Sequence, residues 1–216
     1  MRNEFEKQLV TLNNEMIEMG SMIEKAIEKA IHALVNKDIE VAKEAIEADA
    51  DIDQQEKKIE GLCLKLLLHQ QPVAKDLRTV SSALKMITDM ERIGDHAADI
   101  SEITIYLAKE NTKINLELIR KMAKETTVML VGSIDAFVNK DVSQARDVIH
   151  QDDVVDSLFA QVKKAIVELI HTDSEISEQA MDLLMIAKYF ERIGDHAVNI
   201  SEWVIFSITG EHNGKE

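Results

Sequence analysis

Cysteine, proline, glycine and aromatic residues are all scarce in this chain of 216 residues, which contains one Cys, one Pro, seven Gly and eight aromatic residues. A single cysteine cannot form an intrachain disulfide, so the fold does not depend on an oxidising compartment. Because proline and glycine mark turns, their scarcity argues against a many-stranded sheet. The apolar residues are mostly Ala, Leu, Ile, Val and Met, and together with the abundant Glu and Lys they favour helix. The composition therefore predicts an all-α protein.

Long apolar runs and an excess of positive charge are also missing. No segment approaches the roughly 18 to 20 apolar residues that a membrane span needs, and residues 1–10 lack the apolar core of a secretory signal. The 40 acidic residues outnumber the 25 basic ones, which gives a formal net charge of −15. Without a basic face, binding to nucleic acid is not expected. We therefore expect a cytoplasmic protein with no membrane span, whose acidic surface suits metal cations or basic partners.

What the chain does contain is an internal repeat. The segment ERIGDHAADISE at residues 91–102 returns as ERIGDHAVNISE at residues 191–202. Earlier in each half, LVNKDIEVAKEAI at residues 34–46 matches FVNKDVSQARDVI at residues 137–149. Two matched blocks in the same order indicate a duplicated unit of about 100 residues.

Each unit carries three amphipathic stretches whose apolar residues are spaced alternately by four and three, the pattern of long helices packed nearly parallel or antiparallel. The short breaks make neighbouring helices antiparallel, and the third helix is expected to open at Pro72. The sequence thus predicts a tandem repeat of two three-helix bundles, with six long antiparallel helices. The breaks between helices fall near residues 36–38, 69–72 and 172–174. The boundary between the two units falls at residues 111–113. We therefore expect a first unit at residues 1–109, a second unit at 114–210 and a polar tail at 211–216.

Four carboxylates interrupt the apolar faces at equivalent positions of the two units. Asp49 and Asp152 share one position in the second helices, and Glu91 and Glu191 share one in the third helices. A carboxylate on a packing face costs several kcal/mol to desolvate unless a cation pairs with it. Each of the four is followed one turn later by an aspartate, on the same helix face, where like charges repel unless a cation is present. These aspartates are Asp53, Asp156, Asp95 and Asp195.

If the second and third helices of a unit face each other, its four carboxylates converge, as in the carboxylate-bridged metal sites of helical bundles. Ligand sets made only of oxygen favour hard cations such as iron, manganese, magnesium or calcium. We therefore predict one metal ion or a small cluster in each unit, and no catalytic residues. The predicted ligands form a first acidic cluster (Asp49, Asp53, Glu91 and Asp95) and a second acidic cluster (Asp152, Asp156, Glu191 and Asp195), with Asp99 and Asn199 as candidate outer ligands.

Other interpretations of these residues stay open. An acidic pair on a helix is often simply solvated, and Arg92 and Arg192 could neutralise the carboxylates without any metal. His96 and His196 lie about 140° around the helix from the glutamates, so we interpret them as residues beside the sites or on the surface, not as ligands. The glycine three residues after each glutamate lies on the apolar face, where its missing side chain favours close helix packing.

The segment QQPVAKDLRTV at residues 70–80, followed by two copies of ERIGDHA, resembles the PhoU family, the accessory and regulatory proteins of the high-affinity phosphate transport system. The resemblance covers about residues 1–210. It implies two similar three-helix bundles, a homodimer, and iron clusters, or zinc or other ions, on the E/D-x-x-x-D motifs that match the two acidic clusters. It also implies a cytoplasmic protein, associated with the inner membrane only through two partners, the phosphate ABC transporter and the sensor histidine kinase of the phosphate regulon. Asn199 departs from the pattern of Asp99, so the two sites are expected to differ in charge.

The expected function is that of a regulator and not of an enzyme, because the sequence contains neither a recognisable Ser/His/Asp set nor a glycine loop that could hold phosphate. The resemblance implies negative regulation of phosphate uptake and of the phosphate regulon. Two other functions are weighed against it. One is a carboxylate-bridged metalloenzyme of the oxidase or ferroxidase type, which would be expected to have histidine ligands. The other is a metal-free structural helical adaptor.

Overall fold

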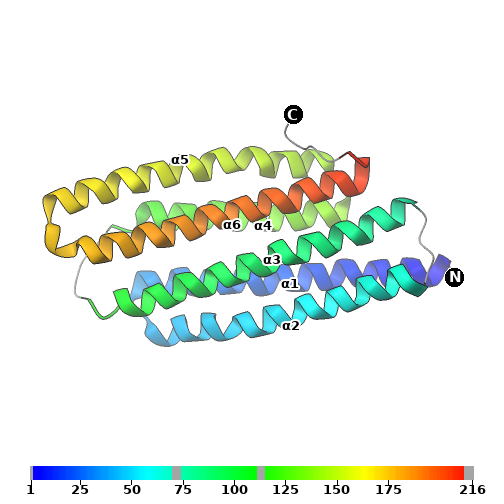
Figure 1. Cartoon of the computed structure of the whole chain (residues 1–216), viewed down its shortest axis with the longest axis horizontal. Helices are drawn as coiled ribbons and strands as arrows, with labels where there is room; N and C mark the ends of the chain where they lie inside the picture. The colour runs from blue at the N-terminus through cyan, green and yellow to red at the C-terminus, as the bar shows by residue number, and fades with distance from the viewer. Residues whose placement is uncertain (1, 70–73, 111–114, 212–216) are drawn as a thin grey trace.

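The computed structural model describes residues 2–69, 74–110 and 115–211. These residues form six α-helices and one short 3-10 helix, η1 (Ser174–Ile176) (Figure 1). The all-α fold and the tandem of two three-helix bundles are confirmed, while the bounds of the two units stay a prediction. The expected opening of the third helix at Pro72 and the boundary at residues 111–113 lie outside the described residues. The helices are α1 (Arg2–Asn36), α2 (Ile39–His69), α3 (Ala74–Leu107), α4 (Glu117–Asn139), α5 (Val142–Thr172) and α6 (Ser177–Thr209).

The matched Asn-Lys-Asp sequences form the turn between the first and second helix of each unit. Lys37 and Lys140 adopt the left-handed conformation, with φ of 55° and 56°, which ends the preceding helix. The aspartate that follows accepts two hydrogen bonds from backbone N–H groups of the next helix. The distances are 3.1 Å for both bonds to Asp38, and 2.9 and 3.0 Å for those to Asp141. These carboxylates satisfy N–H groups that a helix start otherwise leaves without partners.

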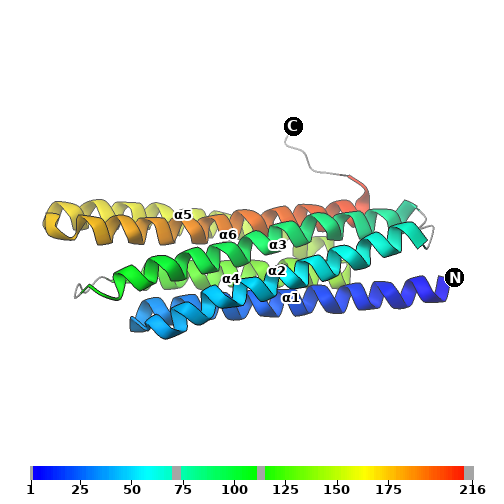
Figure 2. The ribbon, with the colours of Figure 1, turned by 60° about the horizontal axis from the view of Figure 1, so that its bottom comes forward.

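The helices pack in an order that places α3 and α6 side by side in the middle of the molecule (Figures 1 and 2). Within each unit all three helices contact one another, and the units meet where α3 packs against α6 and α1 against α4. Among the described residues, α2 contacts only α1 and α3, and α5 contacts only α4, α6 and η1. The second helix of each unit therefore lies on an outer edge of the molecule.

The core consists of the apolar residues that are spaced alternately by four and three along each helix. Leu12, Met16 and Ile23 of α1 are fully buried, as are Met86 and Met90 of α3. Burial on α3 and α6 extends beyond one helix face, because these two helices contact both their own unit and the other unit. None of the helices in the described ranges carries the long, weakly charged apolar stretch that a membrane span requires.

Candidate metal centres and the interface between the units

The eight predicted ligands lie on the second and third helices of each unit. In the first unit α2 carries Asp49 and Asp53 and α3 carries Glu91 and Asp95, while α5 and α6 carry the corresponding residues of the second unit. Since α2 packs against α3 and α5 against α6, each unit brings its four carboxylates to a single helix–helix interface. The duplicated sequence therefore produces two separate clusters, one near each outer edge of the molecule.

One carboxylate oxygen in each unit is buried against the facing helix without a hydrogen-bond partner. These oxygens are Oδ1 of Asp49 and Oδ1 of Asp152. The motif glycines make room for them, because a Cβ added at Gly94 would lie 3.5 Å from the first oxygen and one added at Gly194 would lie 3.0 Å from the second. The close packing expected at these glycines thus brings each facing helix against an aspartate. A buried carboxylate oxygen without a partner is costly, and a bound cation would satisfy it.

Within the first acidic cluster, neighbouring carboxylates raise one another's pKa, because each negative charge makes ionisation of the next group less favourable. Burial raises the pKa of Asp49, and the charges of Asp95 and Asp53 raise it further. The pKa of Glu91 is also raised, first by burial and then by the charge of Asp95. Glu56 of α2 belongs to the same group, because its charge contributes to the raised pKa of Glu91. The prediction missed it because it considered only pairs four residues apart, and Glu56 follows Asp53 by three.

The second acidic cluster shows the same behaviour. Burial raises the pKa of Asp152 to about 6, and the charges of Asp156, Asp195 and Glu191 add to the shift. Burial and then the charge of Glu191 raise the pKa of Asp195. Buried groups of like charge stabilise one another's neutral forms. At neutral pH this cluster therefore carries an unfavourable concentration of negative charge that a cation would relieve.

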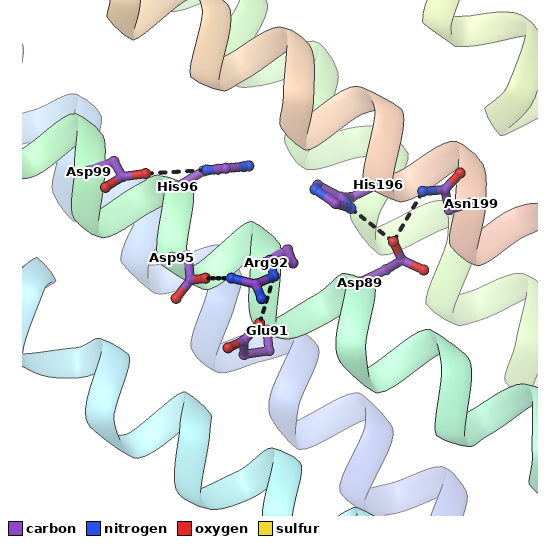
Figure 3. Close-up of polar contacts among 8 residues, drawn as sticks. All are labelled: Asp89, Glu91, Arg92, Asp95, His96, Asp99, His196 and Asn199. Carbon is purple, nitrogen blue, oxygen red and sulfur yellow. Dashed lines mark hydrogen bonds and ion pairs between the residues drawn. The ribbon is translucent and has the colours of Figure 1, made fainter.

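Arg92 neutralises part of the first cluster. Its Nη1 lies 2.8 Å from Oδ2 of Asp95, and its Nε lies 3.5 Å from Oε2 of Glu91 (Figure 3). The alternative in which the motif arginine pairs with the carboxylates therefore applies in part to the first unit. The second copy of the arginine acts in another place, since the charge of Arg192 contributes to a lowered pKa of His96 on α3.

Lys188 takes the corresponding role in the second cluster. It forms an ion pair with Glu191, three residues further along α6, and its Nζ lies 5.4 Å from the ring centroid of Phe159 on α5. Neither residue has a counterpart of the same kind in the first unit, where Thr88 and Glu56 stand at the equivalent positions. Lys188 does not recur in the first repeat, although an alignment of the two repeats already shows it opposite Thr88.

The carboxylates of each cluster share one helix–helix interface, but they are not arranged as the ligands of one cation. Within the described ranges, no group of three or more histidine, cysteine, aspartate or glutamate side chains is already arranged as a metal site. The donor chemistry fits a hard cation, because each cluster offers only carboxylate oxygens and one of these is buried without a partner. The ligand role of the eight residues stays a prediction.

The two motif histidines lie where the units meet, on the sides of α3 and α6 that face each other (Figure 3). Their ring centroids are 5.6 Å apart. The Nδ1 atom of His96 lies 3.3 Å from Oδ2 of Asp99, and the Nδ1 atom of His196 lies 2.8 Å from Oδ1 of Asp89, which also accepts a hydrogen bond from Asn199 at 3.1 Å. His96 is only 8% exposed. The surface position is therefore wrong for His96, because α6 covers it, while a position beside the metal site stays a prediction.

The candidate outer ligands Asp99 and Asn199 also face this interface, as their contacts with His96 and Asp89 show. The charge of Asp99 nevertheless contributes to the raised pKa of Asp49, so its role as an outer ligand stays a prediction. The repeats do not mark Asp89 as a candidate, because Tyr189 stands at its position in the second repeat and the acidic residue does not recur.

Comparison with known families and curated proteins gives a consistent result. A family model described as the PhoU domain matches the chain twice, at residues 16–104 and 119–204. The phosphate-specific transport system accessory protein PhoU homolog of Clostridium acetobutylicum is 36% identical over 211 residues, which cover 97% of this chain and 96% of the relative. The protein of the same name from Aquifex aeolicus is 35% identical over 189 residues, 86% of this chain and 84% of the relative.

Two solved structures resemble nearly the whole chain. The crystal structure of PhoU from Pseudomonas aeruginosa matches with a TM-score of 0.91 at 30% identity, over 96% of this chain and 100% of the other. The crystal structure of the phosphate transport system regulatory protein PhoU from Streptococcus pneumoniae matches with a TM-score of 0.90 at 30% identity, over 97% and 99% of the two chains.

Proposed function

Because the chain belongs to the PhoU family, we propose that it restrains high-affinity phosphate uptake and keeps the phosphate regulon off when phosphate is plentiful. The relatives and structural neighbours are accessory and regulatory proteins and not enzymes. In this proposal the protein acts in the cytoplasm as a homodimer. It couples the phosphate ABC transporter to the sensor histidine kinase through its helical surfaces.

The proposal includes a metal ion or small cluster in each acidic cluster. The observation that carries it is the buried, unpartnered Oδ1 of Asp49 and of Asp152, each beside further carboxylates that raise its pKa. A hard cation would neutralise this repulsion and accept the buried oxygen as a ligand. Iron is the cation that the family resemblance favours, with manganese, magnesium, calcium and zinc as alternatives.

A bound cation would connect the outer helix of each unit to a central one. Asp49 lies on α2 and Glu91 on α3, and Asp152 and Glu191 have the same relation on α5 and α6. Metal binding would therefore stiffen the two outer helices, which offer exposed surface to partners. The oxidase alternative gains no support, because His96 faces the unit interface and not the carboxylates.

Thermal unfolding tests the metal sites directly. For each site that it fills, a cation at 100 times its Kd stabilises the folded state by about 2.7 kcal/mol, which for a chain of this length raises Tm by about 5 to 10 °C per site. We expect this shift with manganese or ferrous iron in the unmodified protein, and none in the double variant Glu91→Ala and Glu191→Ala. Asp51→Ala, at an exposed position of α2, is the matched control and should keep the shift. Equal shifts in all three proteins would show that the clusters bind no cation.

The regulatory role is tested in cells that lack their own copy of the protein. The unmodified chain should restore repression of phosphate-starvation genes, measured with a reporter, and the double glutamate variant should leave them expressed in ample phosphate. Repression by the double variant would show that metals are dispensable for signalling, while failure of the unmodified chain would contradict the regulatory role itself.

A further inference from the structure

The interface between the units contains a pair of histidines that the proposed function does not use. His96 from α3 and His196 from α6 approach with ring centroids 5.6 Å apart and an angle of 38° between the ring planes. The Nε2 atom of His96 is buried and has no hydrogen-bond partner. Figure 3 shows the free ends of the two rings directed toward each other. A buried polar atom without a partner therefore points toward a second potential ligand.

Each ring is held at its other nitrogen by a carboxylate. Asp99 lies 3.3 Å from Nδ1 of His96, and Asp89 lies 2.8 Å from Nδ1 of His196. A carboxylate at Nδ1 keeps the proton there, so the lone pair is on Nε2. The same arrangement of carboxylate, imidazole and metal orients histidine ligands in many metalloproteins.

The spacing of the rings matches that of two ligands on one ion. Imidazole nitrogens bind zinc at about 2.0 to 2.1 Å in tetrahedral geometry, which places the centroids of two such rings about 5.2 Å apart. The observed separation of the ring centroids is 5.6 Å. A small rotation of either side chain would close the difference from about 5.2 Å. Imidazole suits zinc, copper and nickel better than the hard cations that the carboxylate clusters favour.

We propose that His96 and His196 form a third cation site, between the two units, for a divalent transition metal of the zinc type. Within the described ranges no third His, Cys, Asp or Glu completes a ready ligand set, so water fills the remaining positions. The site differs from both acidic clusters in ligand type and in location. It would connect α3 to α6 and thereby fix the two units relative to each other.

Zinc titration of the full chain, monitored by NMR of labelled histidine side chains, tests the proposal. To separate this site from the acidic clusters, the titration uses the variant Glu91→Gln and Glu191→Gln. Zinc should shift the Nε2 signals of His96 and His196 together and leave that of His150, exposed on α5, unchanged. Unshifted His96 and His196 signals at saturating zinc would overturn the proposal, whatever the acidic clusters bind.

Substitutions provide a second measurement. We expect His196→Gln to weaken zinc binding in that background at least tenfold by calorimetry. Asp99→Asn, which removes a positioning residue and keeps both ligands, should weaken it about 10- to 100-fold, and His150→Gln should have no effect. Circular dichroism identifies any variant that fails to fold. Folded variants that all bind zinc as the parent does would contradict the site.

Discussion

The two acidic clusters have equivalent aspartates and glutamates but different surroundings. The first gains the negative charge of Glu56, and Arg92 is its paired cation. In the second, Phe159 replaces that glutamate and Lys188 is the paired cation. A second lysine, Lys163, also lies near Phe159, with its Nζ 4.9 Å from the centroid of the phenylalanine ring.

The difference shows that duplication kept the proposed ligands while their surroundings diverged. Each cluster has one paired cation, which opposes metal binding, but only the first has an additional carboxylate, which strengthens the attraction for a cation. We therefore expect the first cluster to bind a given hard cation more tightly than the second. Two sites of unequal affinity would load one after the other as the metal concentration rises. Four sets of substitutions test this comparison.

The largest difference is expected at the motif glycines. A Cβ at Gly94 would lie 3.1 Å from two carbon atoms of Ile52, a fully buried side chain, whereas at Gly194 the nearest atom would be Oδ1 of Asp152 at 3.0 Å. Because the carboxylate can rotate away more easily than the branched isoleucine, Gly94→Ala should cost about 2 to 3 kcal/mol and Gly194→Ala about 1 kcal/mol. Urea unfolding measures both. Equal costs would show that the two interfaces are packed alike.

The next effect concerns the charge of Asp152 in the metal-free protein. Its pKa is about 6 in the folded chain against an ordinary value of 3.8, so the folded state holds the proton more tightly. Its contribution to the free energy of unfolding is therefore greatest below pH 3.8 and is lost as the pH rises to about 6. Asp152→Asn should stabilise the metal-free protein at pH 7 by about 1 to 2 kcal/mol, a figure reduced for partial exposure.

Denaturant unfolding in the presence of a chelator, at several pH values, checks this prediction. The gain of the Asp152→Asn variant over the unmodified chain should grow between pH 4 and 6 and then level off. Asp147, exposed on α5, supplies the control, since Asp147→Asn leaves in place the charges that act on Asp152 and should give no such gain. A constant difference across the pH range would mean that Asp152 titrates normally.

Exchange of the residues at positions 88 and 188 addresses the paired cation. Lys188→Thr should strengthen manganese binding by the second cluster about three- to tenfold, equivalent to about 1 kcal/mol. Thr88→Lys should weaken binding by the first cluster to a similar extent. Calorimetry on chains in which the other cluster carries a Glu→Gln substitution isolates each site. If both exchanges leave the manganese affinities unchanged, Lys188 is not a cause of the difference in affinity between the two clusters.

The smallest effect is expected at the turns, where the two units are alike. Asp38→Ala and Asp141→Ala each remove a side chain that accepts two hydrogen bonds from the following helix. Each substitution should lower the free energy of unfolding by about 0.5 to 1 kcal/mol, and the two losses should agree within error. A clear inequality would show that divergence between the units extends to the turns.

Much of the fold and of the proposed sites could be predicted from the repeats. Apolar spacing identified the helices, and the pairs at Asp49 and Glu91 stood out because each interrupts an apolar face and recurs in the second half. Glu56 and Lys188 could not be found in this way, since neither recurs. The burial of His96 could not be predicted, because a helical wheel shows that His96 lies away from Glu91 but not which helix covers that side.

The sequence alone determined that the chain is helical, that it is duplicated, and that carboxylates lie on apolar faces, because these properties depend on residues within one or two turns of each other. The tertiary structure decided which faces meet. It buried Oδ1 of Asp49 and Asp152 and brought His96 against His196 across the two units. Those contacts depend on how six helices share their buried surface, and no local spacing specifies that arrangement.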